Sequence, residues 1–168
     1  MLRPDVGGPV PCPPGRGGAP ICLAKVVGQE GGMVDRDRLG RTAVHCAAVE
    51  GGRGSLRVLL AGGADPEAAD AAGWTPLDFA TQTQAPSAVG VLLAAGASVG
   101  AMDGQGNTPL WRAVFCSQGE GAVIRLLLEA GADLDRVNAH GVSPRALARR
   151  IANYEVAGHL PGGDGTSS

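Results

Sequence analysis

The side chains that most often perform catalysis or hold metal ions are few in this sequence and lie far apart along it. Of the three histidines, His45 falls at the start of a predicted helix, His140 in a predicted turn and His159 near the carboxyl terminus. The sequence contains no GxSxG nucleophile motif, no HExxH zinc motif and no glycine-rich loop that could bind phosphate ahead of a helix. We therefore expect neither an enzyme nor a protein that uses a metal ion or another cofactor.

Aspartates are the remaining candidates for acid–base chemistry, but their positions favour a structural role. Asp65, Asp133 and Asp135 stand at the ends of similar segments, where a carboxylate usually accepts hydrogen bonds from the following turn. Two helix layers of about 10 Å each would separate Asp65 from Asp133 by roughly 20 Å. A pair of catalytic carboxylates must lie much closer together than that.

The four cysteines, Cys12, Cys22, Cys46 and Cys116, form no CxxC pair and show no metal-ligand spacing. Cys46 falls at a core position of a predicted helix, where a thiol usually acts as a small buried apolar side chain. The sequence therefore predicts reduced thiols and a cytoplasmic protein, because disulfide frameworks belong mainly to oxidising compartments.

The elements that position these residues recur along the chain. Thr42, Thr75 and Thr108 are 33 residues apart, and Ser143 follows 35 residues after Thr108. Each starts a short apolar segment, and a second apolar segment then ends in Gly-Ala-Asp or a close variant. A hydroxyl at such a position caps a helix by accepting a hydrogen bond from a backbone N–H group. The pattern predicts helix–turn–helix units whose helices are too short to be stable alone and must pack against their neighbours.

The Thr-Pro-Leu segments at 75–77 and 108–110, the spacing of 33 and the Gly-Ala-Asp endings together resemble the ankyrin repeat. The chain is also loosely similar to small stand-alone bacterial ankyrin-repeat proteins. The resemblance implies an all-α ankyrin-repeat solenoid with about three full and one or two partial helix–turn–helix repeats. We expect the repeat domain at 21–156, between disordered tails at 1–20 and 157–168 that are rich in Pro, Gly or Ser. Its units are a partial repeat at 21–36, full repeats at 37–69, 70–102 and 103–137, and a cap at 138–156.

Two details of these repeats are predicted more closely. In the first full repeat we expect helices at 43–49 and 56–61, with Ser55 capping the second. The third repeat carries two extra residues, which belong in the loop at 115–121 between its helices.

Ankyrin repeats usually place a histidine after Thr-Pro-Leu, and this chain departs from that pattern. Only His45 conforms, while Asp78, Trp111 and Arg145 take the position in the other repeats. We therefore expect a thinner hydrogen-bond network between turns, with Trp111 filling the space of the missing ring.

Composition narrows the kinds of partner. The formal net charge of −2 gives no strong electrostatic attraction for nucleic acid or anionic lipid. No apolar run is long enough for a secretory signal or a membrane span. We expect a monomer that does not bind membranes.

Stacked repeats build a concave face from turn tips and first helices, and solenoids commonly bind partners there. The resemblance implies that binding residues flank the turn glycine and lie near the end of the first helix. Trp74 is the sharpest candidate, since Trp and Arg dominate interface energetics; the alternative is that its ring packs over the neighbouring turn. The predicted partner-binding residues are Arg38, Leu39, Arg41, Glu50, Ala72, Trp74, Gln82, Gln105, Asn107 and His140.

Two functions stay open. The first is a protein–protein interaction module with an immunity, scaffold or regulatory role, which suits tips that mix Arg, Trp, Leu and small residues. The alternative is a nucleic-acid-associated accessory protein that uses the Arg-rich first and last repeats; its binding would weaken steeply with salt.

Overall fold

The computed structural model describes residue 36, residues 39–117 and residues 121–150, and this part of the chain is all-α. Most of the predicted partial repeat, both predicted tails, the end of the predicted cap and residues 118–120 of the predicted loop lie outside the described residues. The helices are α2 (Ala43–Glu50), α3 (Arg53–Ala61), α4 (Pro76–Gln82), α5 (Pro86–Ala94), α6 (Pro109–Cys116), α7 (Ala122–Glu129) and α8 (Pro144–Arg150).

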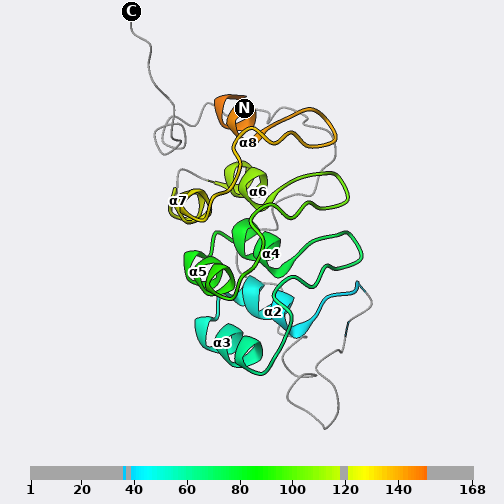
Figure 1. Ribbon diagram of the computed structural model, residues 1–168, viewed down its shortest axis with the longest axis vertical. Helices are drawn as coiled ribbons and strands as arrows, with labels where there is room; N and C mark the ends of the chain where they lie inside the picture. Colours follow the sequence, from blue (N-terminus) through cyan, green and yellow to red (C-terminus); the bar gives the residue numbers. More distant parts are fainter. Residues whose placement is uncertain (1–35, 37–38, 118–120, 151–168) are drawn as a thin grey trace, which may run out of the picture.

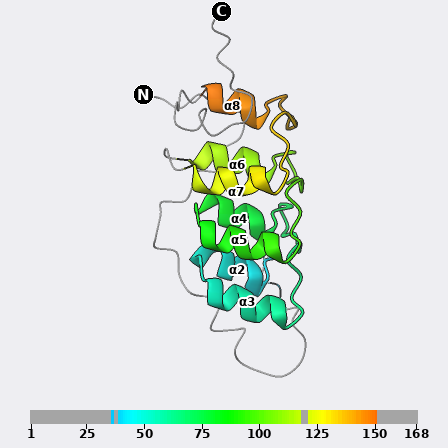
Figure 2. The same cartoon turned by 60° about the vertical axis from the view of Figure 1, so that its left-hand side comes forward.

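These helices form two stacks side by side (Figures 1 and 2). The first helices of successive repeats, α2, α4, α6 and α8, contact one another in order along one stack, and α3, α5 and α7 do the same along the other. The loops that join successive repeats project from the first stack on the side away from the second (Figure 1). The predicted all-α repeat solenoid is confirmed.

Leucine and alanine side chains fill the space between the helices. Leu56, Leu77 and Leu92 are completely buried, and a buried leucine contributes about 1.5–3 kcal/mol relative to an exposed one. Ala47 and Ala48 are also completely buried, and their small side chains let neighbouring helices approach closely. Short helices thus gain from their neighbours the stability that they lack alone.

Threonine and proline set where the first helices begin. Thr75 and Thr108 have extended backbones, and each side chain accepts a hydrogen bond from the N–H group three residues later, at 3.4 and 3.2 Å. The next residue is proline in both repeats, and the first helical position tolerates its missing N–H group. The predicted capping by threonine at these two positions is confirmed.

The second helix of the first full repeat begins earlier than predicted. Helix α3 starts at Arg53, its capping residue is Gly52, and no side chain caps it. The backbone reverses at Gly51, which has a left-handed conformation with φ of 68°, so the helical hydrogen bonds begin with Leu56 N–H donating to Gly52 C=O at 3.0 Å. Ser55 therefore lies inside the helix, and the prediction that it caps the helix is wrong.

The state of the cysteines also differs from the prediction. Cys46 and Cys116 both take part in disulfide bonds, and the described residues contain no free cysteine. The expectation of reduced thiols is wrong for these two residues, because it considered only sequence spacing within CxxC-like motifs.

Candidate protein-binding surface

Each loop between repeats is a short hairpin, which we call a finger; the described fingers are 70–74, 103–107 and 138–142. In each, the first N–H group donates to the C=O group of the last residue, at 2.9, 3.1 and 3.1 Å. The first side chain, Asp70, Asp103 or Asn138, accepts hydrogen bonds from the N–H groups two and four residues later. These bonds fix the loop backbone without help from a partner.

Neighbouring fingers are also bonded to each other. The C=O groups of Leu39, Ala72 and Gln105 accept hydrogen bonds at 2.9, 3.1 and 2.9 Å from N–H groups of the following finger. The turn requires glycine at Gly73, where φ is +82° and an added Cβ would lie 3.0 Å from the backbone of the next finger. The fingers therefore form one connected ladder along the molecule.

Four residues at equivalent places on this ladder point into solvent, and we call them the tip row. The tip row consists of Leu39, Ala72, Gln105 and His140, all exposed. Leu39 is 56% exposed and is the largest apolar side chain of the row. All four were predicted to bind a partner, and the structure brings them together along one edge.

Trp74, the sharpest of the predicted binding residues, lies two positions after the tip and points the other way. It is only 7% exposed, and the guanidinium carbon of Arg112 lies 3.4 Å from the centre of its ring. Phe79 packs against the ring with centroids 5.2 Å apart. The expectation of an exposed tryptophan is therefore corrected, because the reversal at Gly73 turns the side chain beneath the finger.

Two further predicted residues are buried in the same manner. Asn107, equivalent to Trp74 in the next finger, donates to Asp103 Oδ2 at 3.1 Å and accepts from Asn138 Nδ2 at 2.8 Å. Gln82 lies buried at the end of α4. Asn107 therefore holds the fingers together from beneath, and neither residue offers much side-chain area to a partner.

The other predicted residues belong to the first full repeat. Arg41 is half-buried, Glu50 is exposed at the end of α2, and Arg38 lies outside the described residues. Val49, next to Glu50, and Met102, just before the finger 103–107, are exposed apolar side chains that add contact area.

A buried ionic cluster lies beneath the fingers 70–74 and 103–107, and sequence reasoning did not find it. Arg112 donates from Nη2 to Asp103 Oδ2, and its Nε lies 3.6 Å from Asp78 Oδ1. Asp78 is the less satisfied carboxylate, because its Oδ1 and Arg112 Nε make no hydrogen bond. Burial raises the pKa of Asp78 to about 6, and the attraction of Arg112 offsets this only in part.

His45 occupies the corresponding place one repeat earlier. Its Nδ1 accepts from Thr42 N–H at 2.9 Å, and its Nε2 lies 3.0 Å from Trp74 O in the next finger. Burial lowers the pKa of His45, which favours the neutral ring. The side chains of Gln84 and Asn138 also bond across to a neighbouring repeat, Gln84 Nε2 to Ala113 O at 3.1 Å and Asn138 Nδ2 to Asn107 Oδ1 at 2.8 Å.

The register of the last repeat differs from the prediction. Ser143 Oγ accepts from Ala146 N–H at 3.2 Å, so Ala146, not Arg145, stands where His45 stands in the first full repeat. Arg145 instead pairs with Asp135 on the surface, Nε to Oδ1 at 2.7 Å. Trp111 is buried as predicted and stacks on Phe115, with ring centroids 5.3 Å apart.

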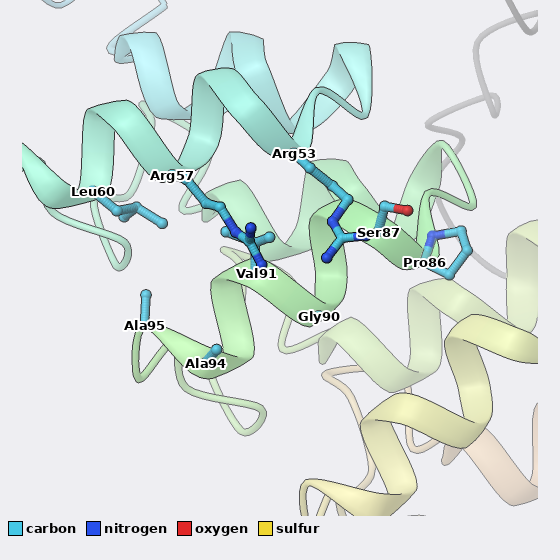
Figure 3. A pocket seen from close by; sticks show the side chains of 9 residues that line it. All are labelled: Arg53, Arg57, Leu60, Pro86, Ser87, Gly90, Val91, Ala94 and Ala95. Carbon is cyan, nitrogen blue, oxygen red and sulfur yellow. The ribbon is translucent and has the colours of Figure 1, made fainter.

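A cavity of about 620 Å³ lies between α3 and α5, in the stack farther from the fingers (Figure 3). Sequence reasoning missed it, although Gly90 inside a helix was a signal for missing side-chain volume. The residues that line it are Arg53, Arg57, Leu60, Pro86, Ser87, Gly90, Val91, Ala94 and Ala95.

Two other kinds of site are absent from the described part of the chain. No three His, Cys, Asp or Glu side chains there lie close enough together to hold a metal ion. No helix there combines the length and the apolar composition that crossing a bilayer requires.

Stacked helix pairs joined by bonded fingers define a repeat solenoid that presents a long edge to other molecules. The family model for ankyrin repeats in three copies matches residues 18–103 and 57–138, so the chain belongs to the ankyrin-repeat family. Ankyrin repeats are in general protein–protein interaction modules, and proteins of the family are typically not enzymes. A comparison with curated proteins found no match.

Proposed function

We propose that this protein is a monomeric interaction module that binds a partner protein along the finger edge and the adjoining first helices, and that it performs no catalysis. The observation that carries the proposal is the tip row, four exposed side chains held at equivalent positions by the ladder between fingers. Because the backbone is already ordered, a partner would bind without paying much conformational entropy.

The proposed contact residues are the predicted ones that lie at or near the surface. They are Leu39, Arg41, Glu50, Ala72, Gln105 and His140. Trp74 and Asn107 support the surface from below, and Gln82 is buried at the end of α4. An immunity, scaffold or regulatory role would be exerted through such a contact.

Affinity purification followed by mass spectrometry tests the proposal. The bait is the full chain, and the test variant combines Leu39→Glu with Gln105→Lys, which changes two exposed tips and no buried contact. The matched control is Val58→Glu, an exposed apolar residue on α3. A protein captured by the wild type and the control but lost with the tip variant supports the proposal. Equal capture by all three baits excludes the finger edge as the binding surface.

The cytoplasmic location predicted from the cysteine pattern stays a proposal. The disulfide-bonded state of Cys46 and Cys116 weighs against it, because such bonds persist mainly in oxidising compartments. Alkylation of the native protein, isolated with acid quenching and without reductant, decides between the two. Free thiols at both residues support the cytoplasm, and oxidised thiols overturn it.

A further inference from the structure

The cavity between α3 and α5 has two sides of different chemistry. Leu60, Val91 and Ala94 contribute apolar side chains, while Arg53 and Arg57 extend from α3 towards α5 (Figure 3). Only Val91 among the lining residues is buried, so the cavity, of about 620 Å³, is an open groove on the surface. The cavity thus offers room for a few side chains of a bound molecule.

Positive charge at this cavity is not balanced by the described part of the chain. None of the nine lining residues is acidic, and no hydrogen bond or ion pair within the described residues engages the Arg53 or Arg57 side chain. The whole chain has a formal net charge of −2, so the positive charge at this cavity is a local excess.

The helix ends at the cavity strengthen the preference for an anion. Arg53 is the first residue of α3, and no acidic residue stands in that first turn. A cation at a helix N-terminus is unfavourable, because the helix dipole places partial positive charge there. Helix α5 also starts at the cavity, with Pro86 and Ser87, and no side chain caps it. A bound carboxylate would offset the partial positive charge at the N-termini of both helices.

We propose that this cavity is a second binding site, distinct from the finger edge, and that it takes an acidic peptide segment of a partner protein. Two carboxylates of the segment pair with Arg53 and Arg57, which lie one helical turn apart, and an aliphatic side chain between them packs on Leu60 and Val91. The apolar floor favours a peptide over a nucleic acid or a free anion, which would leave that floor exposed.

Fluorescence anisotropy with a labelled helical peptide tests the proposal. The probe repeats the unit Glu-Ala-Ala-Leu-Glu, which places two carboxylates and one leucine on the same face of a helix, and its control peptide has Gln for every Glu. Two protein variants disturb the site differently. Arg53→Glu with Arg57→Glu reverses its charge, and Gly90→Leu fills it; an added Cβ at Gly90 meets no atom within 4 Å and the backbone there is unstrained.

We expect the wild type to prefer the Glu probe over the Gln probe, and each variant to weaken binding of the Glu probe by about tenfold or more. The matched control, Arg149→Glu with Arg150→Glu on exposed α8 residues, changes the charge equally and should bind as the wild type does. Equal affinity for both probes overturns the proposal. So does weakening by the α8 variant without any effect of Gly90→Leu, because that result would mean unspecific attraction of anions. Circular dichroism confirms that each variant folds, and none of these substitutions touches the finger edge.

Discussion

The interface between the first and second full repeats and the interface between the second and third solve the same packing problem with different chemistry. In both, the third residue of the first helix lies beneath a finger and is completely buried. At the first interface this residue is His45, whose two ring nitrogens both have partners. At the second it is Asp78, which has an oxygen without a hydrogen bond.

The difference shows that an aspartate in place of the buried histidine requires other residues around it. A neutral imidazole needs only hydrogen bonds, whereas a buried carboxylate needs a positive charge nearby. Arg112 supplies the charge, and it is itself held by Asp103 and by the ring of Trp74. The cost of desolvating such ions can exceed their attraction, so the ionic contacts do not by themselves make the second interface the more stable one.

The largest expected effect comes from removing the cation at the second interface. Arg112→Met leaves Asp78 and Asp103 buried without their positive partner, and we expect a loss of about 3–5 kcal/mol in the free energy of unfolding. Urea denaturation monitored by circular dichroism measures it.

A double variant sharpens this result. Asp78→His with Arg112→Phe copies the residues of the first interface, where His45 packs against Phe79 at 5.5 Å between ring centroids. It should recover at least half of the loss. A double variant as unstable as Arg112→Met would show that the two interfaces are not interchangeable.

The two interfaces should respond to pH in opposite directions. The pKa of Asp78 is raised in the folded protein, so the folded state binds the proton more tightly and stability falls as pH rises from about 4 to about 6. The full effect is at most about 3 kcal/mol. The pKa of His45 is lowered, so the unfolded state binds the proton more tightly and stability falls as pH drops below about 6.5.

Urea denaturation at a series of pH values separates the two contributions. Asp78→Asn should remove the decrease between about pH 4 and pH 6, and His45→Gln should remove the decrease below neutral pH. A profile for Asp78→Asn that is parallel to the wild type would contradict the raised pKa.

A smaller loss is expected at the first interface. In His45→Gln the amide can replace one of the two hydrogen bonds of the ring but cannot reach both Thr42 and Trp74 O, so about 1–2 kcal/mol should be lost. Hydrogen exchange should show the opening of α2 before that of α6, because α2 contacts the rest of the stack through this interface. Protection of α2 equal to the wild type would mean that the bridge to Trp74 O contributes little.

The repeat architecture could be predicted from the sequence because it depends on periodic features. Thr75, Pro76 and the leucines recur at equivalent positions of successive repeats, so their roles could be predicted without knowledge of the tertiary contacts. The error at Arg145 was made after Ser143 had been aligned correctly, because the histidine position is the third residue after the cap and therefore Ala146. The error at Ser55 arose because Gly51 reverses the chain sooner than a cap at Ser55 requires.

The site could be predicted only in part, because side-chain direction within a finger and contacts between repeats leave no mark in a periodic pattern. Ala72 and Trp74 are two residues apart in one finger, yet one faces solvent and the other is buried. Asp78, Asp103 and Arg112 come from two repeats, and an arginine in an amphipathic helix is usually a surface residue. The buried cluster therefore became visible only when the helices were placed side by side.

The smallest expected effect separates the second interface from the finger edge above it. Ala72→Glu changes an exposed tip whose side chain takes no part in the cluster, so the free energy of unfolding should change by no more than about 0.5 kcal/mol. Its pH profile of stability should keep the decrease that we assign to Asp78. If Ala72→Glu instead lost several kcal/mol or flattened that profile, the tips and the buried cluster would act as one unit, and no tip substitution could test binding without also testing stability. An unchanged profile would show that tip residues can be substituted without disturbing Asp78, Arg112 and Asp103, which hold the ladder in place.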